Sequence, residues 1–517
     1  MTPVTAPAAA AARTRQVSTL AVIPWWRIPL YPAALSSALV VMIWGHAGLA
    51  TGMLLRPLAI SVAAGLGLTL LCAAILKDRD RGAMLASIVI LIGITTDDRM
   101  AFVLVMGGAL VMADGLMRRG RPNIVARTST RVLSGIGLIL VIALTIDLIQ
   151  FGAIGAAVAE VTRPPLPPLG VAAADQPDMY LFLLDAYPGD RAAARSATFD
   201  RDAFPDALTA RGFEVVRDSH SNYLQTPLTL ASMLSMRHLA DLPELAPPYG
   251  PVMADWRRLR GVLDDAAAFA ILRDAGYEVT VIDAGYGHAQ MRRVDRFVQS
   301  GVQELEFVLL ESTRLERLLE TVLPSMSADA ARTRVQDAFT SVAAIAAEPH
   351  ATPRFTFIHV SAPHPPWVFN ADGSPRTPLK VSTGGEPGLT LQESRDAGFA
   401  QATYVARLTD EAIDHIIAVS DRPPVIVVMS DHGPGDGFNA DDPFTSDLQV
   451  RASNFMATLA PGHPGLMASR PTPVNLFPTL FGAYLGKDIP HQPDSIWAYR
   501  DSYIDSVEVP PIEGWTR

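Results

Sequence analysis

Five apolar runs in the first 155 residues most constrain what this chain of 517 residues can fold into. They lie near Ile28–Leu49, Leu58–Leu76, Ala83–Thr96, Met100–Leu116 and Leu133–Ile154. A helix needs roughly 20 residues to cross a bilayer core of about 30 Å, and the first, second and fifth runs reach that length. The third and fourth are shorter and could form a spanning or a re-entrant hairpin. The sequence therefore predicts an N-terminal α-helical transmembrane bundle of about five spans.

Basic side chains in this region are concentrated in alternate loops. The rich segments hold Arg13, Arg15 and Arg27, then Lys77, Arg79 and Arg81, then Arg118, Arg119, Arg121, Arg127 and Arg131. The other loops offer Arg56, and Arg99 beside two aspartates. Because Lys and Arg accumulate on the cytoplasmic side of a membrane, the rich loops are expected in the cytoplasm. We therefore expect a multi-pass protein of the cell inner (cytoplasmic) membrane, with its C-terminal domain extracytoplasmic or periplasmic.

These observations predict four parts along the chain. They are a cytoplasmic N-terminal tail (1–27), the transmembrane helical domain (28–155), a Pro-rich linker (156–178) and an extracytoplasmic α/β domain (179–517). Residues 163–178 read RPPLPPLGVAAADQPD. Such a Pro-rich stretch is extended and semi-rigid, so we expect it to act as a spacer between membrane and domain.

The outer domain is acidic and has no cysteine. The first 155 residues hold 13 of the 42 Lys and Arg and 6 of the 52 Asp and Glu, so the remainder has an excess of 17 acidic groups. Phosphate backbones would repel such a domain, which argues against nucleic acid as a partner. The single cysteine, Cys72, lies in an apolar run, so neither disulfides nor a thiol nucleophile are expected outside.

After residue 178 the pattern changes to alternating strands and helices. Continuous apolar runs typical of buried parallel strands lie at Met179–Leu184, Val279–Ile282, Phe355–Val360 and Val425–Met429. Helical patterns occur near Thr229–Met236, Ala266–Ala275, Ala397–Val419 and Val474–Leu485. This alternation predicts an α/β sheet with helices on both faces. Sites on such sheets lie beyond the carboxyl ends of the strands.

Polar side chains fall at those expected positions. Four stretches carry them: YLFLLDAY with Asp185, NYLQTPLTLASMLSM with Thr226 and Thr229, IHVSAPHPPW with His364, and VIVVMSDHG with Asp431 and His432. Carboxylate oxygens and imidazole nitrogens are ligands for a divalent metal. A hydroxyl at a helix start adds a nucleophile near a positive dipole end, where anions are favoured.

Each residue also has an ordinary structural explanation. An aspartate after a strand is usually a turn residue or cap, a threonine before a helix is usually an N-cap, and His364 could lie in an exposed loop. Adjacent Asp431 and His432 at a strand end have no evident packing purpose. The four stretches together, in this order, favour a functional metal site, and a metal there could stabilise charge on an attacked phosphoryl group.

With these stretches in view, the chain resembles the sulfatase-like hydrolase/transferase group of the alkaline phosphatase superfamily. The membrane half and outer domain together are similar to lipoteichoic acid synthases and to phosphoglycerol or phosphoethanolamine transferases. The carriers of the resemblance are the strand ending in Asp185, the SNY…T…LAS segment, the PHPP segment and SDHG. It implies a C-terminal α/β domain of the alkaline-phosphatase/sulfatase type.

The resemblance also implies roles for individual residues. Asp185, Thr226, Asp431 and His432 would hold a metal, Thr226 would be the nucleophile, and His364 would contact the substrate phosphate. Thr226 stands at the sulfatase-like interval before Ala231, and Thr229 is the second candidate. One divalent ion is expected, with Mn²⁺ or Mg²⁺ favoured by the oxygen ligands and Zn²⁺ or Ca²⁺ as alternatives.

Departures from the family pattern bear on the substrate. Sulfatases need a cysteine or serine in a C-x-P-x-R-like motif, whereas this segment reads TPLTL, and Ala186 stands where a second acid often follows the first. Phosphoester chemistry is therefore favoured over sulfate ester cleavage. The expected function is a phosphotransferase or phosphodiesterase acting on a membrane lipid or envelope glycan through a covalent phosphothreonine.

Three rival functions remain open at this stage. They are a sulfatase-type or other ester hydrolase on the same fold, a non-catalytic membrane sensor or scaffold, and a transporter. Intramembrane carboxylates such as Asp147 often mark transport pathways. We expect Asp147 instead to lie near the outer interface or to pair with a neighbouring helix.

Overall fold

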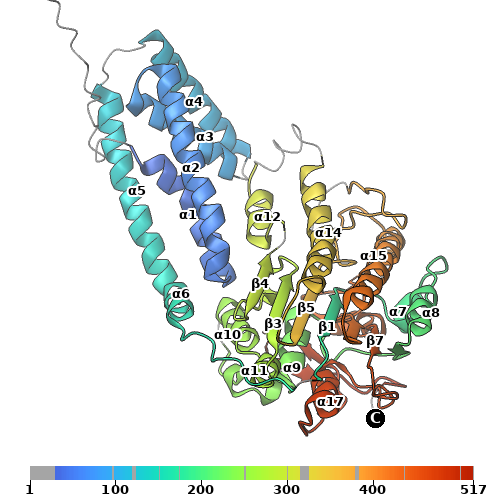
Figure 1. Ribbon diagram of the computed structural model, residues 1–517. Helices are drawn as coiled ribbons and strands as arrows, with labels where there is room; N and C mark the ends of the chain where they lie inside the picture. The colour runs from blue at the N-terminus through green and yellow to red at the C-terminus, as the bar shows by residue number, and fades with distance from the viewer. Residues whose placement is uncertain are drawn as a thin grey trace, which may run out of the picture.

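The computed structural model describes residues 29–95, 98–118, 124–150, 152–173, 175–249, 252–299, 301–314, 325–378, 384–435, 437–500, 502 and 504–515. A bundle of helices is followed by an α/β domain (Figure 1). The expected tail, residues 1–27, lies outside the described residues, as do Arg119 and Arg121 of the basic loops.

The bundle contains α1 (Tyr31–Ala47), α2 (Thr51–Leu76), α3 (Arg79–Ile94), α4 (Asp98–Met117) and α5 (Ile124–Gln150). Within the described residues, three stretches are long and apolar enough to cross a membrane: Thr51–Leu76, Asp98–Met117 and Arg127–Gln150. The predicted count of about five spans is therefore not confirmed.

The spanning lengths also differ from those expected for the first and fourth runs. α1 has 17 residues, because Gly48 adopts a left-handed φ of 65° and ends it, while α4 reaches 20 residues because Asp98 and Arg99 begin it. Asp147 lies 3.2 Å from His46 of α1, so it pairs with a neighbouring helix as expected.

The two ends of the bundle meet different surroundings. At one end the α1–α2 connection contacts the α/β domain, where Arg260 donates to the Gly48 carbonyl at 2.6 Å. The α3–α4 connection lies at the same end, because Arg314 donates to the Thr95 carbonyl at 2.8 Å. At the other end Arg81 pairs with Asp114, beside the basic α2–α3 connection. Thus the α1–α2 connection and the α3–α4 connection both face the α/β domain. These are the two connections that are poor in basic residues.

A seven-stranded sheet with the order β2-β7-β6-β1-β5-β3-β4 forms the centre of the α/β domain. Its strands are β1 (Met179–Leu184), β2 (Glu214–Val215), β3 (Glu278–Asp283), β4 (Arg296–Gln299), β5 (Arg354–Val360), β6 (Val425–Met429) and β7 (Met456–Leu459). β6, β1, β5, β3 and β4 are parallel, whereas β7 runs antiparallel to β6 and β2 antiparallel to β7. The four predicted strands are confirmed, and β2, β4 and β7 are additional short ones.

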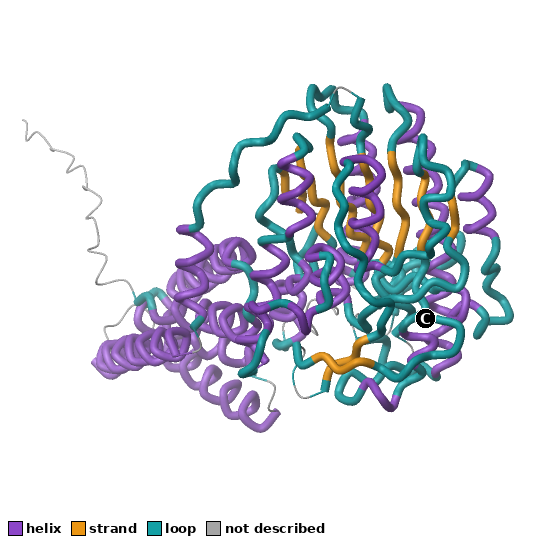
Figure 2. The backbone as a smooth tube through the Cα atoms, turned by 90° about the horizontal axis from the view of Figure 1, so that it is seen from below, coloured by secondary structure: helices purple, strands orange, loops and turns teal. Residues whose placement is uncertain are grey.

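Helices cover both faces of this sheet, as the alternation predicts (Figure 2). The strand β1 is buried throughout, and its side chains alternate between two cores: Leu181 and Leu183 enter one, Tyr180 and Phe182 the other. The first core includes α9 (Thr226–Ser235), α10 (Val252–Asp264), α11 (Ala267–Asp274) and α17 (Pro473–Leu485). The second includes α8 (Ala203–Ala210), α14 (Met326–Ala346) and α15 (Leu391–Val419). Burial on both faces explains the unbroken apolar runs.

The segment between bundle and sheet does not hang free as a spacer. The helix α6 (Ala153–Thr162) comes first, and the Pro-rich stretch that follows lies against α11. Gly170 donates its N–H to the Arg273 carbonyl at 2.8 Å. A Cβ at Gly170 would meet the Asp274 carbonyl oxygen at 1.7 Å, so this approach requires glycine. This stretch is therefore docked on the α/β domain at Gly170.

Candidate active site

The ends of three neighbouring parallel strands bring together the acids and histidines singled out in the sequence. Asp185 follows β1, and Asp431 and His432 follow the adjacent β6. All three side chains are buried, and one ligand atom from each lies within 4.8 Å of the others. Among the described residues this is the one group of at least three such side chains that could hold a metal ion.

Thr226 joins this group from the start of α9. Its Oγ1 lies 3.3 Å from Nε2 of His432. Helix α9 begins at Thr226, three residues before the predicted start, with Pro227 in its first turn, where proline fits. The N-cap position is occupied by Gln225, whose side chain makes no capping hydrogen bond. Thr226 therefore lies inside the helix with its hydroxyl at the metal group, and it is not the N-cap.

Thr229, the second candidate for nucleophile, is placed differently. It is fully buried, and its hydroxyl lies 3.2 Å from the Asp431 carbonyl and 3.3 Å from the Tyr223 carbonyl. Its hydroxyl thus lies among two backbone carbonyls and Oγ of Ser221, which is 3.3 Å away. Thr226 lines the site cavity, whereas Thr229 is not among the residues that line it.

The ring of His432 is oriented so that one nitrogen faces the carboxylates. Its Nδ1 lies 2.9 Å from the Gly433 carbonyl, which can only accept, so the proton is on Nδ1. Burial and the neighbouring Arg451 lower the pKa of His432 well below its usual value, so the ring is neutral. Its Nε2 then carries a lone pair that lies 3.1 Å from Nη2 of Arg451, a donor, and 3.1 Å from Oδ2 of Asp431, also an acceptor. Two acceptors this close favour positive charge beside them, either the Arg451 guanidinium or a metal ion that takes the lone pair.

The carboxylates show the same need for a cation. Oδ1 of Asp185 and Oδ2 of Asp431 are buried and have no hydrogen-bond partner among the described residues. Burial raises the pKa of Asp431, and the charge of Asp185 raises it further. Burial would also raise the pKa of Asp185, but His364 and His359 outweigh it and hold that pKa below its usual range. Two buried carboxylates, a neutral imidazole and a hydroxyl fit a divalent metal ion.

His359 is a site residue that the sequence interpretation missed. It belongs to β5, is buried, and places Nε2 3.6 Å from Oδ2 of Asp185. This Nε2 has no hydrogen-bond partner among the residues described. The available signal was a histidine flanked by apolar residues within a strand, IHV, which is unusual for a core position.

Arg451 is the second missed residue. It ends the short helix α16 (Leu448–Arg451), is buried, and lies 3.1 Å from Nε2 of His432 through Nη2. Close packing of α16 on the SDHG turn explains the glycine there. A Cβ at Gly433 would meet the Val450 carbonyl oxygen at 2.1 Å. Arg451 lies 19 positions after His432, and no sequence pattern connects the two residues.

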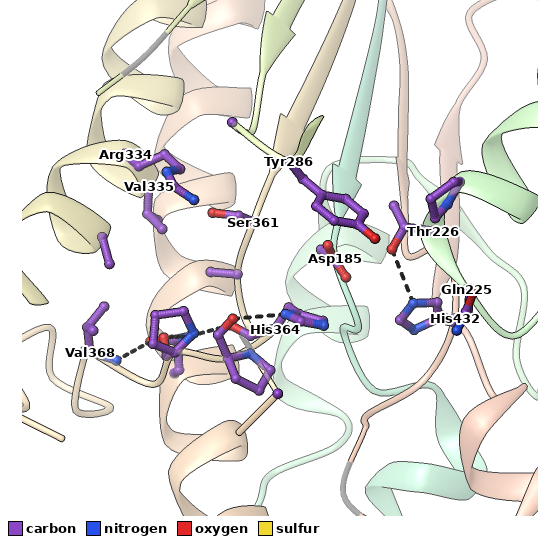
Figure 3. A pocket seen from close by; sticks show the side chains of 18 of the residues that line it. Asp185, Gln225, Thr226, Tyr286, Arg334, Val335, Ser361, His364, Val368 and His432 are labelled. Atoms are coloured by element: carbon purple, nitrogen blue, oxygen red, sulfur yellow. Dashed lines mark hydrogen bonds between the residues drawn. The ribbon is translucent and has the colours of Figure 1, made fainter. Parts of the chain in front are cut away.

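A cavity of about 270 Å³ is lined by Asp185, Thr226, His432 and Arg451 of this group (Figure 3). In the view of Figure 3, Thr226 and His432 lie toward one end, and Arg334 and Val335 of α14 toward the other. Tyr286 lies between the two groups, near Asp185. His364 also lines the cavity, and its Nδ1 donates to the Pro365 carbonyl at 2.9 Å. The structure thus brings all five predicted site residues together.

No family model and no curated protein sequence matches the chain. Solved structures resemble it at low identity. The integral membrane protein lipooligosaccharide phosphoethanolamine transferase A (EptA) from Neisseria meningitidis is 13% identical, with 88% of this chain and 94% of that chain covered and a TM-score of 0.36.

Two further solved structures are similar over a smaller share of this chain. The C-terminal periplasmic domain of EcEptC from Escherichia coli, in complex with Zn, is 15% identical, covering 64% of this chain and 93% of that chain with a TM-score of 0.39. A 4S-sulfatase for glycosaminoglycan metabolism from Bacteroides thetaiotaomicron is 15% identical, covering 61% and 74% with a TM-score of 0.39. Phosphoethanolamine transferases and sulfatases are the proteins that the sequence motifs resemble. Identity and superposition are both low, so the chemistry proposed below rests on this chain's own residues.

Proposed function

We propose that this chain is a metal-dependent phosphotransferase or phosphodiesterase that acts on a membrane lipid or envelope glycan through a covalent phosphothreonine at Thr226. The observation that carries the proposal is the contact of the Thr226 hydroxyl with His432, beside two buried carboxylate oxygens that have no hydrogen-bond partner among the described residues. A hydroxyl is a weak nucleophile until a metal or a base activates it. A metal ion held by this buried group of donors would supply that activation.

Asp185, Asp431, His432 and the Thr226 hydroxyl would hold the ion, with Mn²⁺ or Mg²⁺ expected because three of the four donors are oxygens. When bound, a divalent ion supplies a Lewis acid that lowers the pKa of a hydroxyl and stabilises charge on a phosphoryl group. The chain's own contribution is to hold the donors in place, exclude water by burial, and keep His432 neutral.

The proposed step forms one bond to phosphorus and breaks another. Thr226 Oγ1 forms a bond to phosphorus while the bond from phosphorus to the leaving oxygen breaks, and the hydroxyl proton ends on the departing alcohol. His364 donates its Nδ1–H to the Pro365 carbonyl, so its Nε2 is the nitrogen that can accept that proton at the cavity and pass it to the leaving alcohol. A second alcohol, or water, then attacks phosphorus and releases Thr226. A phosphotransferase uses the alcohol, and a phosphodiesterase uses water.

Phosphoester substrates are favoured over sulfate esters by the residues at the nucleophile position. The one cysteine, Cys72, lies within α2 of the bundle, far along the chain from the site. The TPLTL segment carries two hydroxyl side chains, Thr226 and Thr229. Neither threonine can be converted to the aldehyde that the sulfatase motif implies. A sulfatase remains the rival that the test below must exclude.

A membrane-borne substrate is supported by the position of the helix α12 (Glu304–Glu311). Val308 of this helix lines the cavity. Leu305 and Leu309 of the same helix pack with Trp44 and Met53 of the bundle. One short helix therefore separates the site from the bundle, and a substrate anchored in the bilayer would enter beside it. The loops also support a multi-pass topology with the α/β domain outside the cytoplasm, since the basic connection lies at the far end of the bundle.

The test is a comparison of ester classes on the full chain in detergent. With added Mn²⁺, an aryl phosphodiester should be hydrolysed in preference to the matching aryl sulfate, and a chelator should abolish the activity. Preferential sulfate cleavage would overturn the proposal in favour of the sulfatase reading. Activity of either kind that resists chelation would overturn the metal dependence.

A further inference from the structure

Arg451 is held more rigidly than a long surface side chain. Its Nε donates to the Leu224 carbonyl at 2.8 Å, and its Nη1 donates to the Gly433 carbonyl at 3.1 Å. Its guanidinium carbon lies 4.3 Å from the centre of the Phe438 ring. Two hydrogen bonds and one stacked face fix the plane of the guanidinium, so little side-chain entropy is left to lose on binding.

These contacts hold the guanidinium so that Nη2 lies at the reaction centre. Nη2 lies 3.1 Å from Nε2 of His432, the same nitrogen that lies 3.3 Å from the Thr226 hydroxyl. Arg451 lines the cavity together with Thr226. A fixed positive charge therefore stands next to the proposed nucleophile, in a buried place where charge interactions are strong.

We infer that Arg451 is a catalytic residue that binds the non-bridging phosphoryl oxygens of the substrate through Nη2, and that its other two bonds hold it in that position. The inference rests on the proposed function, since it assigns a role at the same site. The ligand chemistry is that of a phosphoryl or similar tetrahedral oxyanion, for which a preorganised guanidinium is well suited.

A purely structural role is the competing explanation. Arg451 connects the segment before Thr226, at Leu224, with the turn after His432, at Gly433. If it served only to join them, removing it would disturb the metal group and the fold, and oxyanion binding would change only through that damage. The two roles differ in what happens to metal content and melting temperature.

The experiment uses the full chain in detergent, loaded with Mn²⁺, as wild type, Arg451→Met and Arg451→Lys. The control is Arg354→Met, since Arg354 is equally buried but donates to the Ile345 carbonyl and is not among the residues that line the cavity. Each protein is measured for bound Mn²⁺, melting temperature, affinity for inorganic phosphate by calorimetry, and turnover of an aryl phosphodiester.

For Arg451→Met we expect bound Mn²⁺ near the wild-type level, phosphate affinity roughly 10- to 100-fold weaker, and turnover about 10²- to 10³-fold lower. Arg451→Lys should recover part of the phosphate affinity, because lysine keeps the positive charge but lacks the paired N–H donors of the guanidinium. Arg354→Met should lose stability but keep wild-type phosphate affinity.

The outcomes separate this inference from the proposed function. Wild-type phosphate affinity and turnover in Arg451→Met would overturn the inference and leave the function standing. Loss of bound Mn²⁺ in both Arg451 variants would overturn it in favour of the structural role. If no phosphodiester is turned over by wild type, but Arg451→Met still weakens phosphate binding with Mn²⁺ retained, the proposed function fails and the oxyanion site is supported.

Discussion

The Thr226 hydroxyl lies 3.3 Å from Nε2 of His432, although the two residues are 206 positions apart in the chain. One begins the helix α9, and the other ends the turn after β6. Thr226 is not the N-cap of this helix, a position that Gln225 occupies. The contact with the imidazole is the one that the proposed reacting role of Thr226 needs.

Replacing this threonine should abolish turnover with little effect on the fold. Thr226→Ala removes the proposed nucleophile, so we expect turnover to fall by several orders of magnitude, roughly 10⁴-fold or more. The melting temperature should stay near that of wild type, because Thr226 is not the N-cap of its helix. Turnover and thermal melting of purified protein would check both parts.

Thr229→Ala is the matched control, with the opposite expectation. Its buried hydroxyl contacts two backbone carbonyls, so its loss should cost about 1 kcal/mol or more of stability. Turnover should be largely kept. A dead Thr229→Ala beside an active Thr226→Ala would move the nucleophile to Thr229.

The amount of bound metal should depend on the carboxylate of Asp431, which follows β6. Wild-type protein dialysed against Mn²⁺ should retain about one ion per chain, as a single carboxylate–imidazole site implies. Asp431→Ala should lose the ion, because it removes an oxygen ligand and its contact with the Ala186 N–H. Elemental analysis measures this directly, and full retention in the variant would remove Asp431 from the ligand set.

The position of the site on the fold was predictable from the sequence, because strand ends are local features. Asp185 directly follows one apolar run, Asp431 and His432 come shortly after another, and parallel strands bring their ends to one edge. Thr226 was also found, but the sequence pattern put the helix start at Thr229. The periodic signal begins with the apolar residues, whereas Pro227 extends the helix back by one turn.

The residues that sequence reasoning missed act through tertiary contacts. His359 is an interior residue of β5 and meets Asp185 because β5 is hydrogen-bonded to β1. Arg451 reaches His432 because α16 folds back over Gly433. The Arg451 contact leaves no local pattern, and the His359 contact leaves only a histidine between apolar residues of a strand. The strand β2 and the helix α16 are too short for periodicity to mark.

Metal-free protein should become less stable as pH rises through the titration of Asp431. Burial and the charge of Asp185 raise the pKa of Asp431 to about 6, above the value of about 3.9 for an unfolded chain. The folded state therefore binds this proton more tightly. Its contribution is fully present below about pH 4 and is lost as pH rises through about 6.

Melting curves of chelator-treated protein across that range would test this expectation. The melting temperature should fall as pH rises, and the fall should be much smaller in Asp431→Asn, which carries no titrating carboxyl. Added Mn²⁺ should raise the melting temperature most at the higher pH, since the ion binds the ionised form. An unchanged slope in Asp431→Asn would assign the titration to another group.

The orientation of the chain can be tested with reporter fusions. A C-terminal alkaline phosphatase reporter should be active, and a C-terminal fluorescent protein that folds only in the cytoplasm should be dark. The reason is the basic side chains at the bundle end away from the α/β domain, where Arg81 pairs with Asp114. The reverse pattern would place the domain in the cytoplasm and exclude an envelope substrate.

The central claim is that phosphorus becomes bonded to Thr226 during turnover, and trapping that adduct tests it most directly. Full-length protein with Mn²⁺ would be mixed with an aryl phosphodiester, quenched in acid within the first turnovers and analysed by intact mass and peptide mapping. We predict an added phosphoryl group on the peptide that contains Thr226, absent after chelation and absent in Thr226→Ala. Rapid product release with no adduct, or an adduct on another residue, would contradict the account.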